Sequence, residues 1–364
     1  MVCMKNSELE SLYQQGLDLL ISLIETPSFS CQEDHTAILI EEFFTSRNIK
    51  YHRVINNVWA YNKFYNPDKP TILLNSHHDT VKVNPGYTRE PFSADIEDGK
   101  LYGLGSNDAG GALVCLLAAF IHYYDRPDLS YNLCLLASAE EEISGKNGVE
   151  HALKHIGSLS FAVVGEPTKL DLAVAEKGLM VLDCTVQGVS GHAAREEGLN
   201  AIYEAFEDLL WFKNYDFEKE SAFLGKVKMS VTMIHAGTQH NVVPSECSFV
   251  VDVRTTEQYT NTEVLEIIKK HTKCKVQARS TRLNPSGIDL NHPVVASAKS
   301  LGSKLYGSPT MSDQALLSVP SVKVGPGDSA RSHTADEYIY LSEIKDAIAY
   351  YINLLKPLLQ ESVS

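Results

Sequence analysis

The sequence predicts an α/β protein in which a mixed sheet, with helices on both faces, is interrupted by a smaller inserted domain. Nearly continuous apolar runs near residues 71–76, 131–138 and 161–165 alternate with helical patterns, as is typical of strands buried on both faces. Between residues 176 and 284 the strands instead alternate apolar and polar residues, which is typical of half-exposed antiparallel strands. Beyond this segment the first pattern returns.

The outer part of the chain begins with a helix and a strand pair, and it continues with strands that alternate with helices. Apolar residues at helical spacing predict the helices. They are expected near residues 7–25, 36–47, 111–124, 145–155, 293–306 and 341–358. A last strand is expected at residues 321–324.

The inserted part has a β-α-β-β-α-β order, which is the order of a ferredoxin-like domain. Its strands are expected at residues 179–187, 227–235, 247–254 and 274–282, and its helices near 200–213 and 261–271. We therefore expect one discontinuous domain of residues 1–175 and 285–364, and one inserted domain of residues 176–284.

Composition argues against several classes of protein. The net charge of −14 and the lack of a Lys/Arg run argue against nucleic acid or an anionic membrane as a partner. No apolar stretch approaches the ~18 residues of a membrane span, and the amino terminus lacks the pattern of a signal peptide. The seven Cys are scattered, without a C-x-x-C pair, which favours a reducing, cytoplasmic location.

Five predicted strand ends or helix starts carry side chains that can bind a metal ion. Because ligands of open α/β sheets lie outside the carboxyl ends of the strands, one sheet would gather these side chains at one edge. They are His77, Asp108, Glu142, Glu166 and His333. Each alone has another interpretation, since Asp108 also suits a helix N-cap and adjacent glutamates also suit a solvated loop. Together, two His and several carboxylates without Cys favour a hydrolytic two-metal centre.

The order of residues within two motifs indicates a division of roles. His77 and Asp79 lie on the same side of an extended chain, so Asp79 is expected to orient the imidazole of its neighbour. In the run of three glutamates, Glu142 is expected to bind metal and Glu141 to act as the general base.

The expected ligands divide into two sets that share Asp108 as a bridge. Metal 1 would be bound by His77, Asp108 and Glu166, and metal 2 by Asp108, Glu142 and His333. Zn²⁺ suits such nitrogen and oxygen ligands, and Co²⁺ or Mn²⁺ are the alternatives.

With these motifs, the chain resembles the metallopeptidase family of acetylornithine deacetylase, succinyl-diaminopimelate desuccinylase, aminoacylase and glutamate carboxypeptidase. The matching motifs follow the family order along nearly the whole chain. They lie at residues 76–81, 105–108, 138–142, 165–168, 188–193, 241–244, 252–254 and 325–327. The resemblance implies a discontinuous two-metal aminopeptidase-like catalytic domain and an inserted ferredoxin-like lid domain through which the chain forms a homodimer.

The resemblance also implies roles for three residues of the insert. His192 would reach the active site of the partner subunit and stabilise the oxyanion, while Asn241 and Arg254 would bind substrate. The guanidinium of Arg254 suits a substrate carboxylate because it donates two parallel hydrogen bonds. The chain departs from many relatives at Gly110, where they carry Lys, and at Glu140, where Asp is more usual.

The expected function is that of a cytoplasmic enzyme that uses water to remove an acetyl or succinyl group from a small N-acyl amino acid. N-acylornithine or N-acylcitrulline, in arginine biosynthesis, is the favoured substrate. Succinyl-diaminopimelate, acyl-lysine, and di- or tripeptides are open alternatives within the same family. A non-catalytic protein that binds an amino-acid derivative is an alternative of another class, but the intact Glu141 and both His ligands argue against it.

Overall fold

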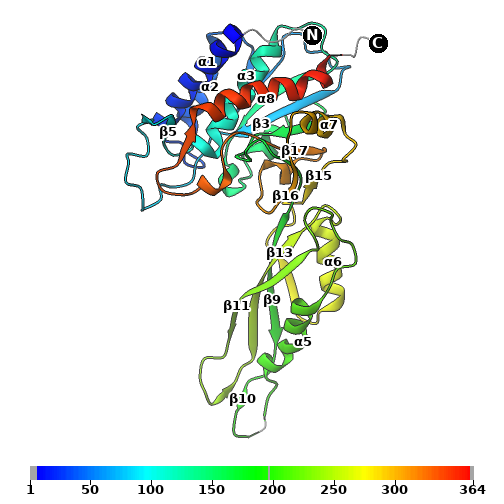
Figure 1. Cartoon of the computed structure of the whole chain (residues 1–364). Coiled ribbons are helices and arrows are strands. Elements are labelled where there is room, and N and C mark those ends of the chain that lie inside the picture. Colours follow the sequence, from blue (N-terminus) through cyan, green and yellow to red (C-terminus); the bar gives the residue numbers. More distant parts are fainter. Residues whose placement is uncertain (1–5, 196, 361–364) are drawn as a thin grey trace. The chain divides into compact units, whose positions relative to one another are not determined.

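The computed structural model describes residues 6–195 and 197–360, and these divide into two compact units (Figure 1). Unit 1 contains the chain up to Val174, then Ile288–Tyr306, and then the chain from Ser312. Unit 2 contains Ala175–Gly287 and Gly307–Met311. The fold class expected from the sequence, an α/β domain interrupted by a ferredoxin-like insert, is confirmed.

A mixed sheet forms the centre of unit 1. Its strands lie in the order β1 (Tyr51–Val54), β2 (Asn57–Tyr61), β6 (Asn132–Ser138), β3 (Thr71–His77), β7 (Phe161–Val164), β17 (Ser321–Lys323) and β8 (Leu172–Glu176). β3 runs parallel to β6 and β7, and β17 runs parallel to β7. The carboxyl ends of four neighbouring strands therefore meet at one edge of the sheet, although β17 is far from the others in sequence.

Helices cover both faces of this sheet. The helices of unit 1 are α1 (Asn6–Glu25), α2 (Asp34–Thr45), α3 (Gly111–Tyr124), α4 (Val149–Ala152), α7 (Pro293–Ser300) and α8 (Leu341–Leu359). α3 packs against β3 and β6, and α1 and α8 pack against α3 (Figure 1). On the other face, Val149 and Ala152 of α4 join Trp59, Leu73 and neighbouring side chains in a separate buried cluster.

Two predicted helices are shorter than expected. The predicted helix at residues 145–155 is reduced to α4, because Glu140 accepts hydrogen bonds from the backbone N–H and the side-chain amide of Asn147 and so holds this segment in a turn. The predicted helix at residues 293–306 ends with α7 at Ser300, and Gly302 follows with a φ of +93°. The chain then forms a strand, β16 (Leu305–Ser308).

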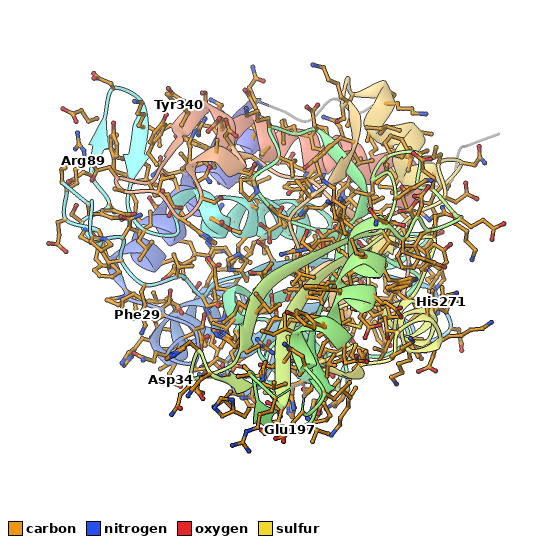
Figure 2. The ribbon with its side chains drawn as sticks, turned by 90° about the horizontal axis from the view of Figure 1, so that it is seen from below. Phe29, Asp34, Arg89, Glu197, His271 and Tyr340 are labelled. Atoms are coloured by element: carbon orange, nitrogen blue, oxygen red, sulfur yellow. The ribbon has the colours of Figure 1, made fainter. Side chains whose placement is uncertain are left out.

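Short elements complete unit 1. A small sheet has the order β18 (Tyr338–Tyr340), β5 (Lys100–Tyr102) and β4 (Ile96–Glu97). Tyr340, the last residue of β18, is labelled in Figure 2, as is Arg89. The Arg89 guanidinium lies 4.0 Å from the centre of the ring of Tyr102, the last residue of β5. Single helical turns are η1 (Ser106–Gly110), η2 (Glu141–Ile143), η3 (Asp313–Leu316) and η4 (Ser329–Arg331).

Unit 2 has the predicted β-α-β-β-α-β order. Its sheet has the strand order β11 (Lys228–Ala236), β13 (Glu246–Thr255), β9 (Gly178–Gln187) and β14 (Lys275–Ala278), and its helices are α5 (Ala201–Asn214) and α6 (Asn261–His271). Buried and partly exposed residues alternate along β9 and β13, so one face of the sheet builds the core of the unit. A small hairpin pairs β10 (Gly191–His192) with β12 (Val242–Val243). The last two residues before the chain returns to unit 1 form β15 (Ser286–Gly287).

None of the helices in residues 6–195 and 197–360 is long and apolar enough to cross a membrane. The six Cys in this described part of the chain are free thiols.

Candidate metal centre

The last residue of β3, His77, places its two ring nitrogens in different surroundings. Nδ1 lies 2.9 Å from the carbonyl oxygen of Asp79 and 3.4 Å from its carboxylate. Nε2 lies 3.3 Å from Asp108 Oδ1 and 3.8 Å from oxygens of both Glu141 and Glu166. An imidazole that donates Nδ1–H to Asp79 leaves Nε2 as the atom that can bind a cation.

Asp79 also holds the turn that carries two of the glutamates. It is 1% exposed, and its carboxylate accepts hydrogen bonds from the backbone N–H groups of Glu141 and Glu142 at 3.0 and 3.2 Å. The Ser30 hydroxyl donates a third hydrogen bond at 2.7 Å. Although burial opposes ionisation, these donors and His77 lower the pKa of Asp79. One carboxylate therefore fixes both the imidazole and the turn that follows β6.

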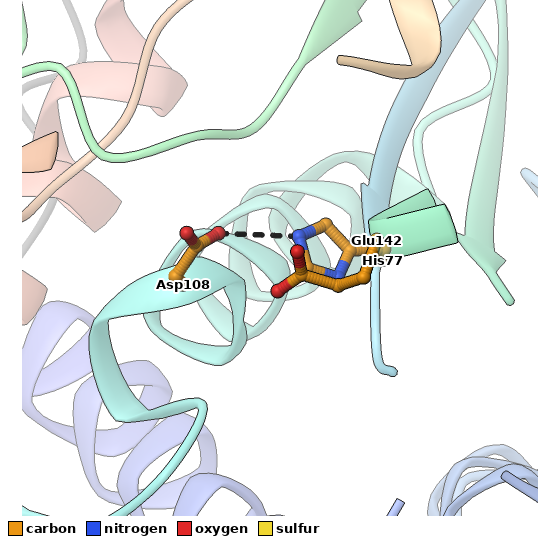
Figure 3. Close-up of side chains that lie close together, drawn as sticks. All are labelled: His77, Asp108 and Glu142. Carbon is orange, nitrogen blue, oxygen red and sulfur yellow. Dashed lines mark hydrogen bonds and ion pairs between the residues drawn. The ribbon is translucent and has the colours of Figure 1, made fainter. Parts of the chain in front are cut away.

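Asp108 lies between the two predicted histidine ligands. Its Oδ1 faces His77 (Figure 3), and its Oδ2 lies 3.7 Å from Nε2 of His333. The same His333 nitrogen is 2.9 Å from Glu142 Oε2. Each oxygen of Asp108 thus points to a different imidazole, which is the geometry required of a carboxylate that bridges two cations.

Side chains with ligand atoms within 4.8 Å of one another form two groups in the described residues. The first is His77, Asp108 and Glu142, drawn in Figure 3, and the second is His77, Glu141 and Glu166. The two groups share His77, whereas the sets predicted from the sequence share Asp108. All five predicted ligands, with Glu141, nevertheless belong to one connected cluster through the His333 contacts.

The cluster concentrates negative charge in a partly buried place. Burial is the main cause that raises the pKa of Glu141, Glu142 and Glu166, and neighbouring carboxylates raise these values further. Burial alone would lower the pKa of His77, but the surrounding carboxylates raise it well above its usual value. Such a set is stable in its ionised form only beside cations.

The donor set fits divalent metal ions. It offers imidazole nitrogen and carboxylate oxygen at the edge of a rigid sheet, and Asp79 orients the imidazole of His77 through its Nδ1. His333 has its pKa raised to about 9, chiefly by its hydrogen bond to Glu142, and a bound cation would take the place of that proton.

The loop that carries Asp108, before α3, packs closely against neighbouring segments at two glycines. Gly105 has a φ of +80°, and a Cβ there would lie 2.6 Å from Thr80 Cγ2. At Gly110, a Cβ would lie 2.6 Å from the carbonyl oxygen of Gly105 and 2.8 Å from Leu20 Cδ1. This packing leaves no room for a longer side chain at Gly110.

Two buried acids next to the cluster were not predicted from the sequence. Asp313 accepts hydrogen bonds from Asn75 Nδ2 at 2.7 Å and from Ser138 Oγ at 2.5 Å, and burial raises its pKa to about 6. Glu337 accepts three backbone N–H groups around Asp108. Burial, with the charge of Asp108 as second cause, raises the pKa of Glu337 to about 8.

The other three predicted site residues belong to unit 2. Nδ1 of His192 accepts the backbone N–H of Ala194 at 3.2 Å, so its other ring nitrogen is the donor in the neutral imidazole. The backbone carbonyl of Asn241 accepts the N–H of Ala193. The guanidinium of Arg254 donates to both oxygens of Asp252, at 2.9 and 3.1 Å.

A model of the peptidase family M20/M25/M40 matches residues 73–356 of the chain. The chain is 29% identical to an acetylornithine deacetylase of Pectobacterium carotovorum, over 90% of this chain and 94% of that protein. It is 27% identical to a LysW-lysine/LysW-ornithine hydrolase of Sulfurisphaera tokodaii, over 94% of this chain and 95% of that protein. A dinuclear metal-binding peptidase of Bacillus subtilis has the same fold, with a TM-score of 0.72 and 16% identity over 95% of this chain and 98% of that one.

Proposed function

The chain belongs to the peptidase family M20/M25/M40 and is a metal-dependent amidohydrolase, and we propose that it removes the acyl group from N-acylornithine or N-acylcitrulline in arginine biosynthesis. The observation that carries the proposal is the partly buried cluster around His77, in a chain whose curated relatives include an acetylornithine deacetylase. The proposal includes a cytoplasmic location, which the unpaired Cys of the described residues support.

We propose that the cluster binds two divalent cations, most simply Zn²⁺. The ligand sets are His77, Asp108 and Glu166 for one ion, and Asp108, Glu142 and His333 for the other. The opposed directions of the two Asp108 oxygens support a shared Asp108. The name of the fold relative from Bacillus subtilis, a dinuclear metal-binding peptidase, also supports two ions.

Glu141 is the proposed general base. Of the adjacent glutamates, Glu142 contacts His333, whereas Glu141 faces His77 and lies near Glu166. When bound, the cations polarise the amide carbonyl and lower the pKa of water at the site. Glu141 accepts a proton from the attacking water, whose oxygen forms the new bond to the acyl carbon, and delivers that proton to the leaving amine as the C–N bond breaks.

His192 is proposed to stabilise the oxyanion in the active site of a partner subunit. The hydrogen bond that its Nδ1 accepts leaves Nε2–H to donate, and an oxyanion requires a donor. Arg254 is proposed to bind the substrate carboxylate, for which its guanidinium must leave Asp252. Asn241 is the third proposed substrate-binding residue of unit 2.

A homodimer through unit 2 is part of the proposal. Tyr203, Phe206 and Leu210 lie at helical spacing on α5 and are more than half exposed. β11 is an edge strand on which Met233 and Ile234 are about half exposed. A long apolar edge strand beside an exposed aromatic helix face suits pairing with a second copy of the chain.

A panel of N-acetyl and N-succinyl derivatives of ornithine, citrulline, lysine and diaminopimelate tests the substrate. The enzyme loaded with Zn²⁺ or Co²⁺ should cleave an N-acylornithine or N-acylcitrulline with the highest kcat/KM. Preference for an acyl-lysine would instead favour the specificity suggested by the Sulfurisphaera relative. Binding without hydrolysis across the panel, with less than one metal ion per chain, would favour a non-catalytic binding protein.

A further inference from the structure

Glu337 is a buried carboxylate that no step of the proposed reaction uses. It is 2% exposed, and both of its oxygens accept hydrogen bonds from one loop. Oε1 accepts the backbone N–H groups of Asn107 and Asp108 at 2.8 and 2.9 Å, and Oε2 accepts that of Gly105 at 3.1 Å. The backbone carbonyl of Glu337 also accepts the N–H of Gly103 at 2.9 Å. One residue thus accepts four of the backbone N–H groups between β5 and α3.

The position of Glu337 in the chain links two halves of the metal cluster. It lies four residues after His333 and immediately before β18, which pairs with β5. The loop that it binds carries Asp108, the residue between the two imidazoles. Sequence positions more than two hundred residues apart are therefore joined by one side chain next to the cluster.

We propose that Glu337 is the positioning residue of Asp108, because its carboxylate fixes the loop backbone in the observed arrangement, which points each Asp108 oxygen to a different imidazole. The inference rests on the proposed function in one respect, namely that Asp108 bridges the cations. Hydrogen bonds from N–H groups to a carboxylate are about twice as strong as neutral ones, and groups behind metal ligands orient them. Loss of Glu337 therefore loosens Asp108 without removing any ligand.

The carboxylate is chemically specific for this task. A Gln at this position offers one oxygen and one NH₂ group, so in either orientation a side-chain N–H faces a backbone N–H. Glu337→Gln keeps the size of the side chain and opposes at least one of the three hydrogen bonds. Glu337→Ala removes all three.

Asp336 provides a matched control on the same segment. Its carboxylate accepts the backbone N–H groups of Thr88 and Arg89 at 2.8 and 3.0 Å, and among the described residues no hydrogen bond joins this carboxylate to the Asp108 loop. Asp336→Asn therefore makes the same change of charge one residue away. If Glu337 only stabilised this segment, both substitutions would act alike.

The test measures amide hydrogen exchange and metal affinity on the full-length protein. For Glu337→Gln we expect the amides of Gly105, Asn107 and Asp108 to exchange at least about tenfold faster in the metal-free protein, while Asp336→Asn leaves them unchanged. Titration calorimetry with Zn²⁺ should show affinity about 10- to 100-fold weaker for Glu337→Gln, and the absorption spectrum of bound Co²⁺ should change. Glu337→Ala should show larger effects. If the Ala variant does not fold, the Glu337→Gln result alone tests the positioning role.

Two results separate this inference from the proposed function. If wild-type protein binds Zn²⁺ and Glu337→Gln has the same affinity, Co²⁺ spectrum and loop exchange, the positioning role is wrong. If wild-type protein binds no divalent metal, the proposed function fails, and unchanged loop exchange in Glu337→Gln would then overturn the inference as well.

Discussion

Replacement of Asp313 by Asn should stabilise the metal-free protein at neutral pH. Asp313 is 3% exposed, and its Oδ2 accepts both the Asn75 amide and the Ser138 hydroxyl. Burial raises its pKa from 3.8 to about 6. Asn keeps the shape and an oxygen for both donors, but it carries no charge at any pH.

The direction in which the stability of the wild type changes with pH follows from proton binding. Because the pKa is raised on folding, the folded state retains a proton that the unfolded state loses between about pH 4 and pH 6. The contribution of Asp313 to stability is therefore greatest below pH 4 and is lost as pH rises through about 6. The difference of 6 minus 3.8, about two units, corresponds to about 3 kcal/mol. The advantage of Asp313→Asn should grow from near zero to about this size over that interval.

Urea unfolding of wild type and Asp313→Asn in the presence of a chelator, from about pH 4 to pH 7, measures this difference. Ser138→Ala is a control of opposite sign. The Ser138 hydroxyl lowers the pKa of Asp313, so its loss should make the stability of this variant fall more steeply with rising pH than that of the wild type. A constant difference between wild type and Asp313→Asn over the whole pH range would refute the reasoning.

The same substitution should also affect catalysis. Burial is the main cause of the raised pKa of Glu141, and the charges of Glu166 and Asp313 add to it. Removal of the Asp313 charge should therefore lower the pKa of the proposed base and move the acidic limb of the pH–rate profile to lower pH.

Three further predictions concern the base, the partner subunit and the dimer surface. Glu141→Gln should retain bound metal and lose at least about 10²-fold in kcat, and near wild-type turnover would contradict its role. Mixing His192→Ala subunits with Glu141→Gln subunits should restore part of the activity, because one site in each heterodimer then has both groups; no recovery in verified heterodimers would argue against shared sites. The double substitution Phe206→Lys and Met233→Lys should give a folded monomer by sedimentation, and a persistent dimer would exclude this surface.

Much of the fold was predictable from hydrophobic pattern. Buried strands such as β3 and β6 contain nearly continuous apolar runs, and each ends at a polar motif. The alternation along β9 and β13 predicted the insert, because one face of that sheet is covered and the other is not. These signals are local, so a single sequence contains them.

Features set by tertiary hydrogen bonds were not predictable in this way. The turn before α4 exists because Glu140 binds Asn147, which the helical pattern of residues 145–155 does not reveal. Glu337 and Asp313 look like ordinary acids in the sequence, and their surroundings come from segments more than a hundred residues away. The pairing of Arg254 with Asp252 had a local signal, since residues i and i+2 share one face of a strand.

The place of β17 in the sheet has a consequence for synthesis on the ribosome. β17 lies between β7 and β8, but it is made only after the whole of Ala175–Gly287. At about 5–20 residues per second, the nascent chain spends on the order of ten seconds with the edge of β7 unpaired. An open edge of buried, apolar backbone invites pairing with other chains. Ribosome-associated chaperones that shield nascent strands should therefore raise the yield of this protein more than that of a protein whose sheet is contiguous in sequence.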